Sequence, residues 1–533
     1  MTESEKIMGD AKTCNVSDLL RSQSDGPGVD IFDAHAVRDA WQEHRASSVR
    51  APCHFYLHIP FCRQRCSYCC YYSVASTGGN QVDEYLASLK QAMTFFAPAF
   101  ARRPFQTLYI GGGTPSLLTP EQLETLLSNL LERYKFDPGG QRTVECNPFS
   151  VSREKLDVLK RFGVNRISMG VQSLSRAPLT SENRGYQNPS IVERAVRLIR
   201  EAGDFDLNLD LLLGMRTDSG KSFLRSFDNI IRLDPDEITV YTISPQGDYL
   251  DKFYAGEPSL FRAHLAGSFG EVPKLIRSRN HGRCRLSQRE PTLKDHAWHF
   301  SGGAHQQRHG YDDFSPNPAS VFGLGPSARS RVAGVLTYAE ETRLPAPFDP
   351  RRPVYRGRRL NMRDEMVKSL VVRICGGKEI SPEDFRRMFG LRIEAAFPAE
   401  IELLRQEGLL TSSGDRLEFH IPSAEDRARC ASLFAAPAGL TLETASGRWR
   451  LNIEPRRGGI DYLAETAALG LRLAQDGAPW APPQNPRVSR IVAALFLQAA
   501  ADKPVSAIKI VERAYSASLA GVAPRLRAVL RCN

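Results

Sequence analysis

The stretch HFYLHIPFCRQRCSYCCYYSV, residues 54–74, joins an apolar run to four closely spaced cysteines. The run FYLHI predicts a buried strand, and the cysteines follow it in a loop. They lie too close together to act as separate disulfide staples, and the total of eleven cysteines is odd. In a reducing compartment such a cluster predicts a metal or iron–sulfur site.

Three of these cysteines, Cys62, Cys66 and Cys69, have the spacing C-x3-C-x2-C. Three thiolates hold three corners of a cubane cluster and leave the fourth iron open for a substrate, whereas ordinary electron-transfer clusters use four. Zinc would require a fourth ligand. His58 is the nearest candidate, but it is poorly placed on the strand just upstream.

Strands and helices alternate after this loop. Strands are predicted at 55–59, 106–115, 143–148, 166–173, 205–215 and 237–243, and helices at 83–96, 119–134, 152–163, 189–203 and 219–233. Thr119 is expected to cap its helix, with Pro120 at the first position and Gln122 three residues after the cap. The alternation predicts a parallel sheet with right-handed crossovers, either doubly wound or barrel-like.

The remaining segments are less regular. A polar N-terminal arm with a helix near 33–45 comes first, and 250–320 is expected to be irregular. A strand with a glycine turn is predicted at 319–330. A helix at 362–374, two or three helices within 381–410 and a strand at 416–421 have the order of a winged-helix-like module. The tail from about 436 includes a predicted helix at 489–501.

Composition limits the partners. The net charge of +10 suggests an anionic partner only weakly. The Arg-rich stretch 351–363 is interpreted as a solvated basic linker or an anion-binding patch. No nucleic-acid motif is found. No apolar run reaches the roughly 18 residues that span a bilayer, and the N-terminus lacks an apolar signal region. We therefore expect a cytoplasmic protein without nucleic-acid or membrane partners.

The C-x3-C-x2-C motif, with Tyr68 before its third cysteine, resembles the signature of radical S-adenosylmethionine (SAM) enzymes. The stretches YLHIPFC, GGGTP, VECNP, RISMGVQS, NRGY, LDLLLGM and FGLGPSARS resemble successive motifs of the oxygen-independent coproporphyrinogen III oxidase branch. The resemblance implies an α/β fold, with an incomplete (β/α)6 TIM-like barrel and a winged-helix-like module, and it extends to about residue 430. The chain continues beyond it in a C-terminal extension of unknown role. We expect boundaries of 1–50 for the arm, 51–250 for the core, 251–340 for its completion and second SAM region, 341–435 for the module and 436–533 for the extension.

The resemblance also implies cofactors and roles. Cys62, Cys66 and Cys69 would hold a 4Fe-4S cluster, and SAM at the open iron would yield a 5′-deoxyadenosyl radical. Two SAM molecules and an external one-electron reductant, such as flavodoxin or ferredoxin, are expected. Tyr56 matches a family tyrosine beside the cluster and is a catalytic candidate, although its place on the strand also suits a core residue. The residues expected to contact SAM are Gly111, Gly112, Gly113, Thr114, Glu145, Gln172, Arg184 and Asp210, with Gly323 and Gly325 at the rim of the second SAM site.

Departures from the family bear on the substrate. The oxidases carry a cysteine two residues after the third cluster cysteine, but this chain has Tyr71 there and places Cys70 directly after Cys69. A catalytic role is hypothesised for Cys70. Three functions stay open for the scaffold. The first is methyl or methylene transfer to an sp2 carbon of a small molecule by a class C-like methyltransferase or cyclopropanase. The second is coproporphyrinogen oxidation or other porphyrin chemistry, and the third is non-enzymatic heme trafficking.

Overall fold

In the computed structural model, the described residues are 30–46, 51–76, 80–101, 104–243, 245, 247–277, 297–301, 317–341, 343–344, 346–375, 377–406, 408–413, 416–421, 427, 430–431, 434, 441–444 and 447–450. They divide into two compact units. The first takes Ile31–Asp313 and Ala319–Gly357, and the second consists mainly of the chain from Arg358 onward. The domain boundaries expected from the sequence remain predictions.

Six parallel strands form the centre of the first unit. They are β2 (Cys53–Ile59), β5 (Thr107–Gly112), β6 (Arg142–Cys146), β7 (Arg166–Gln172), β8 (Asp206–Leu213) and β9 (Glu237–Thr242). Each pairs in parallel with the next one along the chain. Every residue of β2 is buried, as expected for a parallel strand covered on both faces. The predicted α/β core is thus confirmed.

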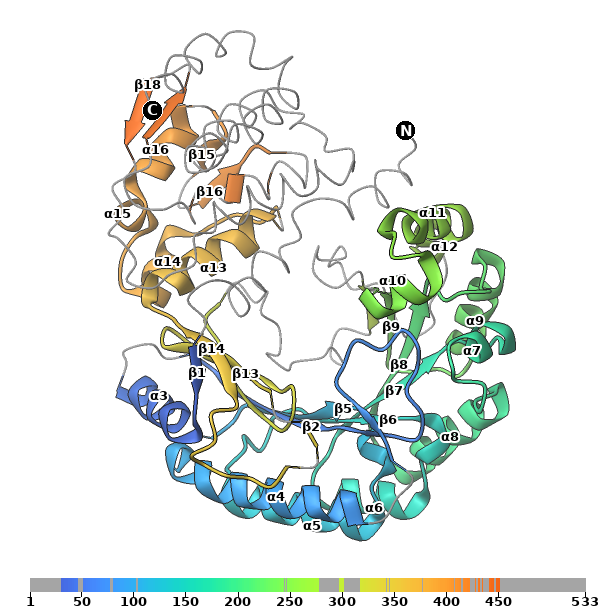
Figure 1. The fold of residues 1–533 in the computed structure, drawn as a ribbon. Helices are drawn as coiled ribbons and strands as arrows, with labels where there is room; N and C mark the ends of the chain where they lie inside the picture. The colour runs from blue at the N-terminus through green and yellow to red at the C-terminus, as the bar shows by residue number, and fades with distance from the viewer. Residues whose placement is uncertain are drawn as a thin grey trace. The chain divides into compact units, whose positions relative to one another are not determined.

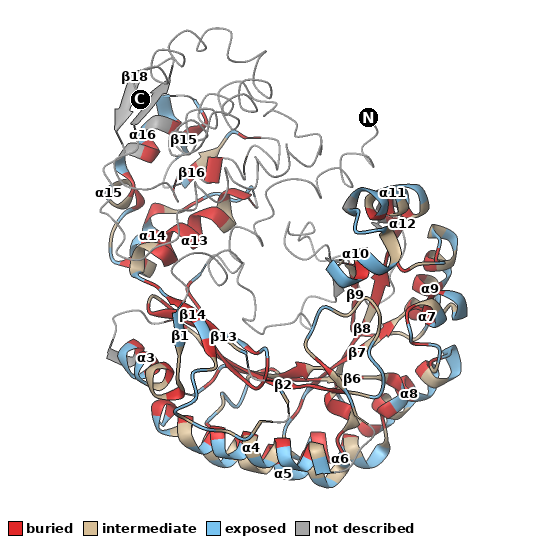
Figure 2. Ribbon diagram, viewed as in Figure 1, coloured by how far each residue is buried: buried red, intermediate tan, exposed pale blue. Residues whose placement is uncertain are grey.

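Helices connect these strands and cover the outer face of the curved sheet (Figure 1). They are α4 (Asn80–Phe96), α5 (Pro120–Arg133), α6 (Arg153–Arg161), α7 (Arg176–Ser181), α8 (Pro189–Ala202) and α9 (Gly220–Arg232). Thr119 caps α5 in a capping box with Gln122, as predicted. Figure 2 shows the buried stripes of these helices turned toward the sheet and their exposed faces turned outward. Apolar burial on one helix face therefore fixes the helices against the strands.

Further strands extend the sheet at both ends. On one side β11 (Ser320–Leu324) runs parallel to β2, followed in order by β12 (Arg329–Val332), β13 (Leu336–Glu340), β14 (Tyr355–Arg359) and β1 (Asp30–Phe32). On the other side β10 (Ala297–Ser301) is antiparallel to β9. Because β1 and β10 are separate edges of one sheet, the barrel is incomplete, as expected.

The N-terminal helix α3 (Ala34–Ala46) belongs to the core. Trp41 is 2% exposed and donates its indole N–H to the Tyr338 hydroxyl at 2.9 Å. Its ring also contacts Phe100 and Phe322. Phe322 meets Phe96 of α4 on the same side, so α3 covers the helix-bearing face of β11.

Two expectations are wrong in part. The segment 250–320 is not simply irregular, since it contains α10 (Gly247–Tyr254), α11 (Pro258–Phe269), α12 (Val272–Arg277) and β10. Buried Tyr249, Phe261 and Phe269 hold these helices in the core. The Arg-rich stretch is not simply a solvated linker, because it includes β14, and Arg358 is buried with its guanidinium 3.7 Å from the carboxylate of Asp364.

The second unit has the order predicted for a winged-helix-like module. Helices α13 (Met362–Cys375), α14 (Pro382–Phe389), α15 (Ile393–Ala396) and α16 (Pro398–Gln406) precede an antiparallel pair, β15 (Leu410–Ser413) and β16 (Arg416–Phe419). In the tail, β17 (Thr441–Thr444) and β18 (Gly447–Arg450) pair antiparallel, where no strand was predicted. The predicted helix at 489–501 lies outside the described residues. No helix in the described part of the chain is long and apolar enough to cross a bilayer.

Candidate active site

The cysteine loop is closed at its base by a short ladder. Strand β3 (Phe61–Cys62) pairs in parallel with β4 (Val74–Ala75). The Val74 N–H donates to the Pro60 carbonyl at 2.7 Å, and the Ser76 N–H donates to the Cys62 carbonyl at 2.8 Å. These bonds hold the loop at the carboxyl end of β2, where ligands collect in parallel α/β sheets.

The thiols of Cys62, Cys66 and Cys69 are partly buried, and none forms a disulfide. Burial raises the pKa of the Cys62 thiol, and burial raises the pKa of Cys69 to about 12. The charge of each neighbouring thiolate opposes ionisation of Cys69, so the three sulfurs share one electrostatic environment. Binding of a metal centre here would release protons from these thiols.

Three free, partly buried thiols on one loop fit the three protein-held corners of an iron–sulfur cluster. Within the described ranges, no three His, Cys, Asp or Glu side chains are arranged around one metal ion. A cubane cluster takes each thiolate on a different iron, so its ligands do not converge on one point. The hydroxyl of Thr114 lies 3.6 Å from Cys62 Sγ, and a guanidinium nitrogen of Arg184 lies 3.6 Å from Cys66 Sγ. Two predicted SAM-site residues thus contact two predicted cluster ligands.

The glycines after β5 lie against the start of the cysteine loop. The Gly113 N–H donates to the Ile59 carbonyl at 2.8 Å. A Cβ on Gly113 would lie 2.7 Å from the Phe61 carbonyl oxygen. Gly112 has φ +113°, and a Cβ there would lie 2.7 Å from the His58 ring. Only glycine fits this close approach of backbone.

Glu145 lies beside these glycines at the end of β6. Its carboxylate accepts the Tyr109 O–H at 2.7 Å and the Gly112 N–H at 3.1 Å. A Cβ on Gly111 would lie 2.9 Å from the Glu145 carboxyl carbon. Burial raises the pKa of Glu145, against the lowering effect of both hydrogen bonds and of the positive charge of Arg166. The structure therefore brings Glu145 together with Gly111 and Gly112.

Asp210 occupies a polar layer inside the sheet. Its carboxylate accepts the Asn208 side-chain N–H at 2.7 Å and the Ser168 hydroxyl at 3.3 Å. Burial raises the pKa of Asp210 to about 7. The negative charge of Glu145 also raises this pKa, and Arg166 lowers it, so Asp210 and Glu145 act on each other electrostatically.

Gln172 and Arg184 lie side by side over Gly170. A Cβ on Gly170 would lie 2.8 Å from Gln172 Nε2 and 3.7 Å from Arg184 Nη2. Gln172 has φ +69° at a bulge between β7 and β8, a conformation uncommon for a residue with a side chain. Such backbone strain collects at functional sites.

Tyr56 is buried on β2, and its O–H donates to His58 Nδ1 at 3.0 Å. His58 Nε2 is 2.9 Å from the Tyr72 carbonyl, which can only accept, so the imidazole is protonated at Nε2 and accepts at Nδ1. Burial lowers the pKa of His58 to about 4, so this ring is neutral. The His58 ring is therefore held by Tyr56 and by the cysteine loop, which argues against zinc ligation.

Gly323 lies in β11 and Gly325 directly follows that strand, on the side of β2 opposite to β5. Gly323 is the register partner of Tyr56. Gly325 has φ +103°, and a Cβ there would lie 2.8 Å from the His58 carbonyl oxygen.

Cys70 and Tyr71 are exposed, and Tyr71 is 56% accessible. Cys70 thus differs from the three partly buried cysteines beside it.

Sequence reasoning missed Glu182, a fully buried carboxylate. It accepts from the backbone and side chain of Arg216, each at 3.0 Å, and from the Tyr249 hydroxyl at 2.9 Å. Its carbonyl accepts the Ser67 N–H of the cysteine loop at 3.2 Å. Its position two residues before Arg184, a predicted SAM-site residue, was the feature of the sequence that could have pointed to Glu182. Glu182 therefore anchors the cysteine loop to the segment that carries Arg184.

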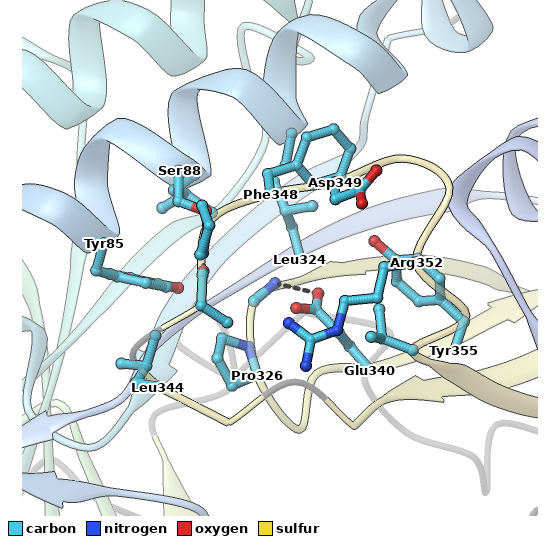
Figure 3. Close-up of a pocket in the computed structure, with 16 residues that line it drawn as sticks. Tyr85, Ser88, Leu324, Pro326, Glu340, Leu344, Phe348, Asp349, Arg352 and Tyr355 are labelled. Atoms are coloured by element: carbon cyan, nitrogen blue, oxygen red, sulfur yellow. Dashed lines mark hydrogen bonds between the residues drawn. The ribbon is translucent and has the colours of Figure 1, made fainter.

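A separate cavity lies between α4 and the segment 344–355 (Figure 3). Tyr85 and Ser88 line it from the helix, and Glu340 accepts the Gly325 N–H at 3.1 Å within it. Among the predicted site residues, Gly325 lines this cavity. The cysteines do not line it, so it is distinct from the candidate cluster site.

Comparison with known proteins gives one family match. Residues 56–230 match the radical SAM superfamily. The chain is 31% identical over 222 residues to the oxygen-independent coproporphyrinogen III oxidase of Escherichia coli K12, covering 42% of this chain and 46% of that protein. It is 26% identical over 370 residues to the heme chaperone HemW of Bacillus subtilis, covering 67% of this chain and 92% of that protein.

A solved structure shares the fold. The coproporphyrinogen III oxidase of Escherichia coli, a radical SAM enzyme, superposes with a TM-score of 0.57 at 21% identity, covering 76% of this chain and 93% of that one. In sequence, however, the chain spans about half the length of the curated oxidases that it matches. Sequence similarity to the oxidases is therefore limited to part of their length.

Proposed function

Because residues 56–230 form a radical SAM domain, which uses a 4Fe-4S cluster and SAM, we propose that this chain is a methyl- or methylene-transferring enzyme. Its acceptor would be an sp2 carbon of a small molecule. When bound, the cluster and SAM supply a radical that abstracts hydrogen, and an external one-electron reductant supplies the electron. The second SAM molecule, as the source of the transferred carbon, is part of this proposal.

The residues of the chain would hold and orient these groups. Cys62, Cys66 and Cys69 would bind three irons and leave the fourth for SAM. The Glu145 carboxylate uses one oxygen for Tyr109 and the other for Gly112, and each oxygen keeps a further lone pair for a cationic amino group. This places a negative charge next to the glycines at which backbone can approach a ligand.

Other residues would complete the two SAM sites. Gln172 and Arg184 lie side by side over Gly170 and offer amide and guanidinium donors to a carboxylate. Asp210, with its raised pKa, would bind a ribose hydroxyl in the polar layer of the sheet. Gly323 and Gly325 would border the second SAM molecule beside β2.

The departure at Cys70 and Tyr71 supports transfer over oxidation. The oxidase resemblance calls for a thiol at position 71, where this chain has an exposed tyrosine. The chain's extra cysteine is Cys70, one residue earlier, and it is exposed. Since a shift of one residue on a tight loop changes the direction of a side chain, the role of the oxidase thiol is not carried over to Cys70. Since sequence similarity to the oxidases also spans only 46% of their length, we do not assign the oxidase substrate to this chain.

Two other functions have an observation in their favour. Coproporphyrinogen oxidation is favoured by the 31% identity to the oxidases over the core. Heme trafficking is favoured by the 92% coverage of the Bacillus subtilis chaperone. Oxidation and trafficking involve products or ligands that differ from those of methyl transfer. One set of assays therefore distinguishes the three functions.

The test is anaerobic turnover of the reconstituted protein with methyl-labelled SAM. Candidate acceptors are small aromatic and polyene compounds, with coproporphyrinogen III as the alternative substrate. Labelled product with one S-adenosylhomocysteine per 5′-deoxyadenosine supports the proposal, and Cys66→Ala should abolish both products. Release of carbon dioxide from coproporphyrinogen III without label transfer overturns it in favour of oxidation. Heme binding without SAM cleavage overturns it in favour of trafficking.

A further inference from the structure

Arg184 is a buried guanidinium that three separate groups hold in place. Its side chain belongs to the loop after α7, and the residue is 7% exposed. The Nε–H donates to Gln187 Oε1 at 3.2 Å, and Nη2 donates to the Gly170 carbonyl. The remaining nitrogen, Nη1, lies 3.6 Å from Cys66 Sγ. The two other bonds therefore fix the direction in which Nη1 meets the sulfur.

The charge of this guanidinium is not balanced by a neighbouring carboxylate. In the described part of the chain, Arg184 forms no ion pair with Asp or Glu. The guanidinium instead lies beside Cys66 Sγ and over the Tyr186 ring, 5.9 Å from the ring centroid. A buried cation requires a compensating charge, and a cluster held by thiolates supplies negative charge at this position.

Hydrogen bonds to cluster sulfurs and nearby positive charge favour the reduced, more negative cluster, so they raise its reduction potential. We propose that Arg184 donates an N–H···S hydrogen bond to Cys66 and thereby sets the reduction potential of the cluster, separately from any contact with SAM. Arg184 is a positioning and tuning residue in this role. The inference rests on the cluster of the radical SAM domain and not on the acceptor of the proposed reaction.

The test compares reconstituted wild-type protein with Arg184→Gln and Arg184→Lys in the absence of SAM. A redox titration followed by electron paramagnetic resonance measures the reduced-to-oxidised ratio of the cluster at fixed applied potentials. For Arg184→Gln we expect this ratio to fall about tenfold, which is about 59 mV for a one-electron couple. Arg184→Lys keeps the charge without the planar fork, so its change should be smaller. Arg161→Gln, which alters an exposed surface arginine, is the control and should leave the ratio unchanged.

Two further measurements decide the remaining outcomes. Exchange into D2O should shift the iron–sulfur vibrations of the wild type. The shift should be smaller in Arg184→Gln, because the exchangeable N–H···S hydrogen bond is missing. If Arg184→Gln does not hold a cluster, Gln187→Leu keeps the arginine but removes its Nε acceptor. Gln187→Leu should also lower the ratio of reduced to oxidised cluster, and an unchanged ratio overturns the inference. A variant that weakens SAM binding while its SAM-free potential stays at the wild-type value also overturns it, because Arg184 would then act on SAM alone.

Discussion

Replacing Glu145 with Gln tests whether the carboxylate beside the glycines binds SAM. The substitution keeps the shape and the acceptor for the Tyr109 O–H, but it removes the negative charge. Its amide NH2 would also face the Gly112 N–H, which now donates to a carboxylate oxygen at 3.1 Å. Hydrogen bonds to charged groups contribute about 1.5–3 kcal/mol. Since about 1.4 kcal/mol is tenfold in affinity, the Kd for SAM should rise about 10- to 100-fold.

The assay is anaerobic calorimetric titration of SAM into reconstituted protein with a full complement of iron. Glu124→Gln is the matched control, because Glu124 is a half-exposed surface carboxylate that pairs with Arg161 at 2.7 Å. Tyr109→Phe removes one hydrogen bond to the carboxylate but keeps its charge. It should therefore weaken SAM binding less than Glu145→Gln does.

The pH dependence gives a second readout. Burial raises the pKa of Glu145, so its carboxylate takes up a proton at a higher pH than an exposed glutamate does. Binding that requires the charged form is complete above this raised pKa and is lost as pH falls through it. SAM affinity of the wild type should therefore decline on acidification, and the part of the decline due to Glu145 should vanish in Glu145→Gln. A Kd for Glu145→Gln within twofold of the wild type at pH 8 would refute the reasoning.

Three further perturbations have defined outcomes. Gly112→Ala should reduce SAM affinity at least tenfold, because its Cβ would lie 2.7 Å from the buried His58 ring. The matched control is Gly334→Ala, where φ is +70° and an added Cβ would meet no heavy atom within 4 Å; it should leave SAM affinity unchanged, and equal effects of the two variants would contradict this explanation. Glu237→Gln removes the partner of the buried Arg166, to which it is now ion-paired at 2.5 Å. Hydrogen exchange across β7 and β9 should therefore show the free energy of unfolding lowered by about 3–5 kcal/mol, and the double variant Arg166→Met with Glu237→Leu should recover most of this loss. A double variant that loses the sum of the two single-variant losses would contradict the importance of the pair. Cys66→Ala should leave no intact cluster by iron analysis and absorbance, and full iron content would remove Cys66 from the ligand set.

Local sequence patterns predicted the elements whose determinants are themselves local. The capping box at Thr119 was confirmed because its two bonds connect residues three apart. The antiparallel strands β12 to β14 were missed, since they are short, contain arginine and glycine, and depend on their neighbours in the sheet. Helices α10 and α11 were missed because Gly256, at φ +74°, interrupts the apolar pattern between them.

In the candidate site, too, local features were predicted from the sequence and long-range contacts were not. The cysteine spacing predicted a shared loop. The resemblance placed Glu145 and the β5 glycines among the residues expected to contact SAM, and the structure shows a hydrogen bond between Gly112 and Glu145. The contact between Arg184 and Cys66 joins positions 118 residues apart, and no local pattern reveals it. The proton arrangement of His58 likewise depends on Tyr72, which reaches it only through the folded loop. Residues that act through long-range contacts therefore had to be found in the structure.

The ladder between β3 and β4 has a consequence for cluster assembly. By joining the two ends of the cysteine loop, it lowers the loop-closure entropy that remains to be lost when iron binds. Once one thiol has captured iron, the other two meet it at a high effective concentration, as in an intramolecular reaction. Cluster insertion should then behave as a single cooperative event, in which partly ligated intermediates are short-lived. The timing of maturation would be set by delivery of iron and sulfide and not by folding of the loop.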